Sequence, residues 1–134
     1  MDPLALLSGD PEAFIRDVWG RRILVHEVEP ARLEGLFDIG QADHLITETA
    51  IRTPQLRLAQ SGSVLPESRF TKQASIAGKP MTGLIDGRKV LDEFAGGATI
   101  VFQGLQRYWQ PLRALVRGLE VALGHPCQAN AYLT

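Results

Sequence analysis

One stretch of this chain limits its possible folds more than any other, because apolar residues recur there at intervals of three and four. This spacing predicts an amphipathic helix of about five turns, with Gly124 and Pro126 ending it. Pro111 lies inside the pattern, so either the helix is kinked there or it begins at Gln110 and the preceding turn is separate. The apolar positions are Leu105, Trp109, Leu112, Leu115, Val116, Leu119, Ala122 and Leu123.

Strand-like segments lie on both sides of this helix in the sequence. Ala98–Phe102 is a compact apolar run between glycines, which is typical of a buried strand. Cys127–Thr134 alternates small apolar and polar residues with the period of a half-buried strand, and Gln55–Gln60 alternates in the same way. We therefore predict an α/β (α+β) fold in which the long helix packs on a small sheet containing 98–102 and 127–133.

The rest of the chain predicts shorter elements. Asp10 followed by proline is a helix start, and Ile23–Val28 has the β-branched content of a short strand. Two short helices broken near Gly40 follow, and Asp86 caps another short helix. Residues 61–87 read as a long connection that contains at most a short strand.

Composition indicates one ordinary domain spanning residues 1–134. The 14 basic and 15 acidic side chains give a net charge of −1, which lacks the basic excess that nucleic acids and anionic membranes select. We expect neither as a partner. The apolar run Leu4–Leu7 is too short for a signal core or a membrane span, so we expect the protein in the cytoplasm.

The residues that most often carry chemistry form no familiar motif. The histidines His26, His44 and His125 share no metal-ligand spacing, so the sequence predicts no metal site. The single cysteine, Cys127, is better explained as a small buried residue than as a nucleophile, and no Gly-x-Ser-x-Gly motif is present. We predict no catalytic residue in this chain.

Three stretches in order resemble a known family. They are Val18-Trp19-Gly20 with the following strand, then Gly97-Ala98-Thr99-Ile100-Val101-Phe102, then Gln128-Ala129-Asn130-Ala131-Tyr132-Leu133-Thr134. Together they resemble the N-terminal part of the cupin-like JmjC oxygenases, which include ribosomal-protein hydroxylases. In that family an Asn-x-Tyr strand opens the double-stranded β-helix. The resemblance implies the N-terminal helix and strand layer of that fold, with the barrel incomplete.

The resemblance also implies a function. The family carries out Fe(II)- and 2-oxoglutarate-dependent hydroxylation of a protein or small molecule, with iron held by a His-x-Asp pair and a distant histidine. That pair would lie beyond Thr134, so we expect the isolated chain to be inactive and to bind neither cofactor. By resemblance, Tyr132 points its hydroxyl toward a carboxylate of 2-oxoglutarate, and Asn130 and Thr134 share its face of the strand.

Two hypotheses follow from this resemblance. Either the chain is the front portion of an oxygenase whose catalytic barrel is missing, or it is a non-catalytic interaction or scaffolding module derived from the same fold. In both, Gln128–Leu133 would be a strand without its usual neighbours. We therefore expect a homo-oligomer formed through this C-terminal strand.

Overall fold

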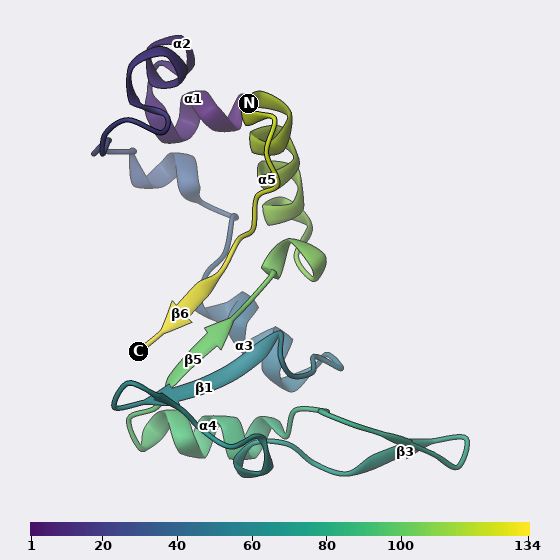
Figure 1. Cartoon of the computed structure of the whole chain (residues 1–134). Helices are drawn as coiled ribbons and strands as arrows, with labels where there is room; N and C mark the ends of the chain where they lie inside the picture. Colours follow the sequence, from purple (N-terminus) through teal and green to yellow (C-terminus); the bar gives the residue numbers. More distant parts are fainter. The chain divides into compact units, whose positions relative to one another are not determined.

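A computed structural model describes residues 1–134 and shows a mixed helix and strand fold of the α+β class with open sheets (Figure 1). Its contacts group into two compact units. The first comprises Met1–Phe37 and Gln106–Gln128, and the second comprises Asp38–Leu105 and Ala129–Thr134. No helix is both long enough and apolar enough to cross a membrane. The prediction of a single domain stays a prediction.

The first unit is helical. Asp2 and Asp10 cap the first two helices by accepting hydrogen bonds from backbone N–H groups at 2.9 and 3.0 Å. Each is followed by a proline, whose fixed φ suits the first turn of a helix. The elements are α1 (Pro3–Ser8), α2 (Pro11–Ala13), the π-helix η1 (Phe14–Val18), the 3-10 helix η2 (Pro30–Leu33) and α5 (Gln110–Leu123).

The long helix α5 packs against α1. Leu4 and Leu6 of α1 are buried, as are Leu112 and Val116 of α5. The two helices approach closely at Gly118, where an added Cβ would lie 2.4 Å from the Cγ atom of Pro3. A side chain larger than hydrogen is therefore excluded at this crossing.

The second unit contains a four-stranded antiparallel sheet with the order β2-β1-β5-β6. A separate hairpin, β3-β4, follows β2 in the chain. The strands are β1 (Leu56–Gln60), β2 (Ser63–Val64), β3 (Ala74–Ile76), β4 (Lys79–Met81), β5 (Thr99–Phe102) and β6 (Ala131–Leu133); the helices are α3 (Ile39–Thr47), the 3-10 helix η3 (Glu67–Arg69), α4 (Gly87–Ala95) and, at the change between the units, the 3-10 helix η4 (Leu105–Arg107).

One face of this sheet forms the core of the second unit. Leu56 and Leu58 of β1 and Phe102 of β5 are completely buried, and Ile100 is 1% exposed. Helix α4 contacts β5, and α3 packs on α4 (Figure 1). Asp38 and Asp86 cap these helices through hydrogen bonds to backbone N–H groups. The alternation of β1 thus places its leucines in the core and Arg57 on the opposite face.

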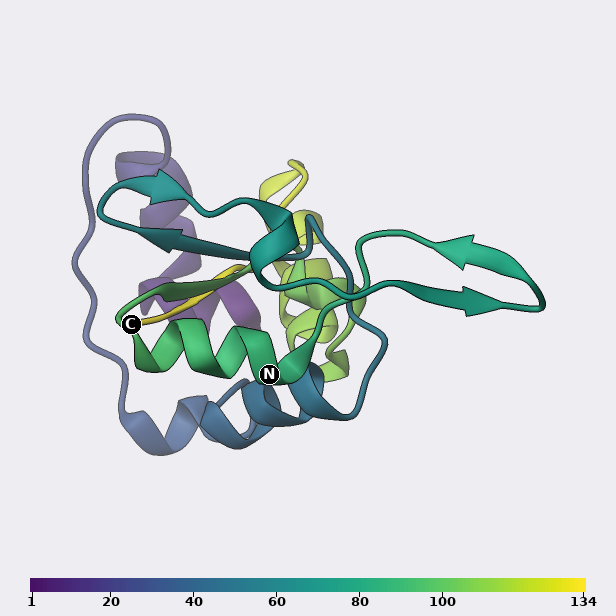
Figure 2. The same cartoon turned by 90° about the horizontal axis from the view of Figure 1, so that it is seen from below.

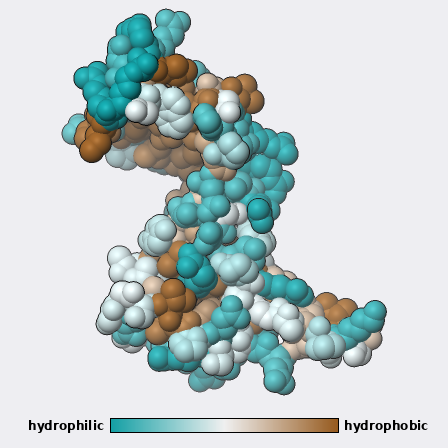
Figure 3. Space-filling model, viewed as in Figure 1, coloured by the Kyte–Doolittle hydropathy of each residue, from teal (hydrophilic) through white to brown (hydrophobic).

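The β3-β4 hairpin extends away from the sheet of its unit, as the two views show (Figures 1 and 2). Its turn residues Ala77 and Gly78 both have positive φ, 50° and 74°, as the tightest hairpin turns require. Hydrophobic surface is visible on this hairpin among hydrophilic atoms (Figure 3), and Ile76 is 63% exposed.

Several predicted elements are confirmed. The buried strand at 98–102 is β5, the alternating segment at 55–60 is β1, and the C-terminal strand is present over Ala131–Leu133. Helix α5 begins at Gln110, with Pro111 in its first turn, so the alternative without a kink is correct. Gly124, with φ 67°, ends the helix.

Two predictions are wrong, and one stays a prediction. The segment Ile23–Val28 is not a strand, because no other segment pairs with it; Ile23 and Val25 remain 90% and 87% exposed. Within its own unit helix α5 packs on α1, and its packing on the sheet stays a prediction. The helix break lies before Asp38 rather than near Gly40, because the Asp38 carboxylate caps α3 and leaves Gly40 inside it.

Candidate functional site: the polar face of the sheet

The face of the sheet opposite the core carries most of its polar side chains. Arg57 of β1 pairs with Val101 of β5, which pairs with Tyr132 of β6, so these three side chains form one row across the sheet. In the next row, the Thr99 hydroxyl donates a hydrogen bond to the Thr134 hydroxyl at 3.1 Å. We call this surface the polar face and define it by Arg57, Thr99, Gln103, Tyr132 and Thr134; the Val101 side chain between Arg57 and Tyr132 is buried.

Tyr132 is the aromatic residue of the polar face, and it is accessible to solvent. Its side chain is 64% exposed, and its hydroxyl makes no hydrogen bond within the protein. A phenolic hydroxyl both donates and accepts hydrogen bonds. Tyr132 is therefore available to an external ligand.

The other two residues predicted to bind the cofactor lie close by and make contacts within the protein. Asn130 comes immediately before β6, and its Oδ1 atom accepts a hydrogen bond from the Gly104 backbone N–H at 3.0 Å. Thr134 is joined to Thr99. Asn130 therefore fixes the entry of β6 beside β5, and the roles of Asn130, Tyr132 and Thr134 as cofactor ligands stay predictions.

Arg57 is the residue of this face that the sequence analysis missed. Its Nη2 donates to the Gln103 Oε1 atom at 2.6 Å, whereas its Nε is buried without a hydrogen-bond partner. No carboxylate forms an ion pair with it. An unsatisfied buried donor of this kind costs about 1–3 kcal/mol. Arg57 thus brings an uncompensated positive charge to the polar face.

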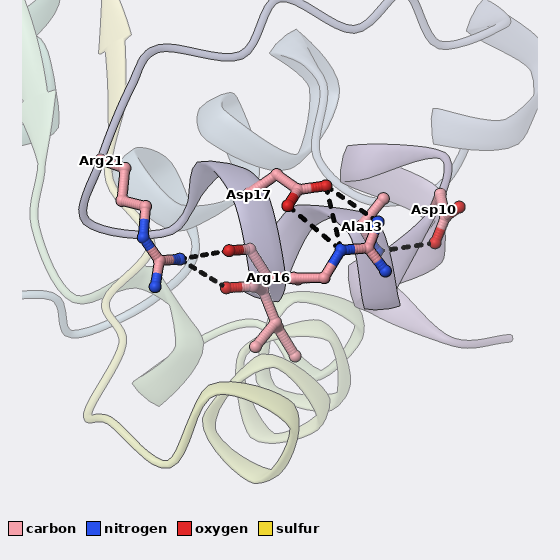
Figure 4. Close-up of polar contacts among 6 residues, drawn as sticks. Asp10, Ala13, Arg16, Asp17 and Arg21 are labelled. Atoms are coloured by element: carbon pink, nitrogen blue, oxygen red, sulfur yellow. Dashed lines mark hydrogen bonds and ion pairs between the residues drawn. The ribbon is translucent and has the colours of Figure 1, made fainter.

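Arg16 in the first unit differs from Arg57, because its guanidinium forms an ion pair with a carboxylate of the protein. Its guanidinium donates to Asp17 at 2.8 Å, and both side chains are largely exposed (Figure 4). The hydrogen bonds from Arg16 lower the pKa of the Asp17 carboxyl and raise the pKa of Arg16 itself. Arg21 completes this cluster by donating to the backbone oxygens of Ile15 and Arg16.

Metal ligands are not gathered at the polar face or elsewhere. No group of three or more His, Cys, Asp or Glu side chains lies close enough to hold a metal ion. The His44 ring lies 3.2 Å from the Glu48 carboxylate one helical turn away, and the His125 ring lies beside Trp19, tilted by 47° with ring centroids 6.1 Å apart. Cys127 is half-buried, and its thiol lies 3.5 Å from the His125 backbone oxygen.

Two open grooves elsewhere in the second unit are weaker candidates. One, of about 940 Å³, lies along the β3-β4 hairpin, and the other, of about 810 Å³, lies between the end of α3 and the start of α4. Lys72 lines both grooves, and Lys89, which lines the first, donates to the Thr71 backbone oxygen at 3.0 Å. Neither groove includes a residue of the polar face, and surface lysines alone indicate no particular ligand.

Comparisons with known proteins add no relative to this description: no protein-family model matches the chain, and no curated protein matches it.

Proposed function

We propose that this chain is the N-terminal part of a cupin-like JmjC oxygenase and that its polar face contributes to binding 2-oxoglutarate. The corresponding family function is Fe(II)- and 2-oxoglutarate-dependent hydroxylation of a protein or small molecule. The iron ligands would lie outside these 134 residues, and the isolated chain would be inactive.

The observation that carries the proposal is the exposed Tyr132 hydroxyl in an ordered strand. Two of the three stretches that carry the family resemblance, 97–102 and 128–134, contain the paired strands β5 and β6. The pairing aligns Tyr132 with Val101, and the Thr99–Thr134 hydrogen bond holds the next row. Tyr132 thus projects from an edge strand that hydrogen bonds of Asn130 and Thr134 hold in place before and after it in the chain.

The donors on the polar face suit one of the two cofactors. A carboxylate is satisfied by hydroxyl and guanidinium donors, and Tyr132 and Arg57 provide both kinds. Fe(II) needs imidazole and carboxylate ligands, and no side chain of either kind belongs to the polar face. The proposal therefore assigns 2-oxoglutarate recognition, and not iron binding, to this chain.

The experiment is a turnover assay on two polypeptides. With Fe(II), oxygen and 2-oxoglutarate, the 134-residue chain should form no succinate above a protein-free control. A polypeptide extended by the residues that the gene encodes after Thr134 should form succinate. In it, Tyr132→Phe should raise the KM for 2-oxoglutarate about tenfold or more, because one hydrogen bond to a charged carboxylate is lost. Val64→Ala, on the far edge of the sheet, is the matched control.

Two results would contradict the proposal. One is succinate formation by the 134-residue chain itself. The other is a gene that continues past the Thr134 codon without any His-x-Asp pair, since the family chemistry then has no metal site.

The position of β6 favours a second candidate function, a non-catalytic module that associates with another copy. β6 is the last strand of the sheet and pairs only with β5. An edge strand offers unpaired backbone groups to another chain, and Ala131–Leu133 contains no lysine or proline that would oppose this. We propose a homo-oligomer formed through β6 as this alternative.

Light scattering over a concentration series tests the alternative. The wild-type chain should dimerise, and Tyr132→Lys should shift it to monomer, because two lysines would meet across a symmetric strand pair. Val64→Lys adds the same charge to β2 at the opposite edge and should leave the dimer intact. A wild-type chain that remains a 14.7 kDa monomer at high concentration would exclude this candidate.

A further inference from the structure

The segment Ile23–Val28 of the first unit has a backbone without partners. None of its N–H groups donates a hydrogen bond within the protein, and none of its carbonyl oxygens accepts one. Ile23 and Val25 are among the most exposed apolar side chains of the chain, although β-branched residues favour the half-buried surface of a sheet. A segment with these two properties is a template for pairing with another strand.

Alternate side chains of this segment face opposite sides, as they do in a strand. Arg22 and Leu24 line a small groove beside Val18. An added Cβ at Gly9 would lie 2.9 Å from the His26 ring. The even-numbered residues therefore lie against the helices of the first unit, and the odd-numbered residues face solvent.

The solvent-facing side is complementary to itself. A positive charge, Arg21, precedes two apolar residues, and a negative charge, Glu27, follows them. Two copies that run antiparallel, with Leu24 of each at the two-fold axis, place Ile23 opposite Val25. The same register places Arg21 of one copy opposite Glu27 of the other. A parallel pair would instead place like charges opposite each other, so the charges favour the antiparallel arrangement.

We infer that Ile23–Val28 is a docking strand for a second copy of this chain, which pairs with it antiparallel about a two-fold axis. The contact uses groups that the single chain leaves free. Ile23 and Val25 exchange backbone hydrogen bonds, and Glu27, which forms no ion pair within the protein, gains one. Arg21 donates through Nη1 to backbone oxygens of η1 and keeps its other N–H groups for the partner.

This inference goes beyond the proposed function and does not depend on it. It places the contact between copies in the first unit, and it competes with β6 as the place where two copies meet. The two contacts make opposite predictions for Tyr132→Lys, which would separate a pair formed through β6 and should leave a pair formed through Ile23–Val28 intact.

Sedimentation velocity over a concentration series measures the association of the 134-residue chain and its variants. The wild-type chain should form a dimer. Glu27→Arg should raise the dimer dissociation constant about tenfold or more, because like charges then face each other at both ends of the pair. Glu34→Arg makes the same change at an exposed position outside the segment and should not alter the dissociation constant.

Charge exchange tests the register. Arg21→Glu alone should weaken the dimer as Glu27→Arg does, and circular dichroism checks that each variant stays folded. The double variant Arg21→Glu/Glu27→Arg should restore the dimer, because opposite charges again face each other in the antiparallel register. Hydrogen exchange gives a second readout, since the free N–H groups of Ile23 and Val25 should become protected as the concentration rises.

Three results would overturn the inference. The first is a wild-type chain that remains a 14.7 kDa monomer at high concentration. The second is a dimer that Tyr132→Lys dissociates and Glu27→Arg leaves intact, which would assign the contact to β6. The third is a dimer in which the exchange of the Ile23 and Val25 N–H groups is as fast as in the monomer.

Discussion

The two faces of one small sheet differ in what holds them together. On the core face, Leu56, Leu58 and Phe102 are completely buried, and every contact they need comes from the protein itself. On the polar face, Tyr132 has a hydroxyl without a partner, and Arg57 has a buried Nε without one. The core face is complete as the chain stands, whereas the polar face has capacity for further hydrogen bonds.

This difference separates residues that make the fold from residues that serve a ligand. Leu58 and Arg57 are neighbours on β1 and point to opposite sides of the sheet. Substituting one should affect stability, and substituting the other should affect binding. The comparison fails if both substitutions affect the same property.

The largest expected effect is that of Leu58→Ala. Removing a completely buried leucine side chain leaves a cavity in the core face and should lower the free energy of unfolding by about 2–5 kcal/mol. Urea denaturation followed by circular dichroism measures this loss. A loss below about 1 kcal/mol would show that the leucine is not tightly packed and that the core face is misassigned.

A smaller effect is expected from Arg57→Leu. The substitution keeps an apolar stem and removes the unpaired guanidinium, so the lost hydrogen bond to Gln103 is offset by relief of the buried donor. The free energy of unfolding should stay within about 1 kcal/mol of the wild type in the same urea experiment. A loss of about 2 kcal/mol or more would assign Arg57 to the fold instead of to a ligand.

The smallest effect is expected from breaking the exposed ion pair between Arg16 and Asp17 in the first unit. The hydrogen bonds from Arg16 hold the pKa of Asp17 below its usual range in the folded chain. The pair therefore stabilises the fold above the unfolded pKa of the carboxyl, and this contribution is lost as the pH falls through the lower, folded pKa. Asp17→Asn should slightly lower the melting temperature at pH 7.

The difference between Asp17→Asn and the wild type should shrink as the solution is acidified. Thermal melts at a series of pH values measure it. A melting temperature difference that grows on acidification would contradict the assignment, and so would one that is large at pH 7, since exposed ion pairs contribute little.

The sequence predicted strands well where other strands are available to pair with them. Ala98–Phe102 and Ile23–Val28 both have β-branched apolar residues, yet only the first becomes a strand, between β1 and β6. Strand propensity describes how a side chain fits a half-buried surface and does not provide the neighbouring strand. The β3-β4 hairpin was harder to predict, because its turn uses Ala77 at a position where asparagine or glycine is the usual signal.

The candidate site was partly predictable, because some of its residues lie on one strand and others come from strands far away in the sequence. Alternation alone puts Tyr132 and Thr134 on one face of a strand, and the family resemblance draws attention to them. Arg57 lies 75 residues earlier, and only the registers of β1 with β5 and of β5 with β6 place it in the row of Tyr132. Register depends on pairing across the whole sheet, which the sequence of one strand does not contain.

The central claim is that the polar face contributes to binding the carboxylate of 2-oxoglutarate through Tyr132, and isothermal titration calorimetry of the polypeptide extended beyond Thr134 tests it most directly. The wild-type extended polypeptide should bind 2-oxoglutarate at a single site, whereas the 134-residue chain alone should bind none. Tyr132→Phe should raise the Kd about tenfold or more while the urea midpoint stays unchanged, because the substitution removes only an exposed hydroxyl. Equal Kd values for the wild type and a folded Tyr132→Phe variant would contradict the account.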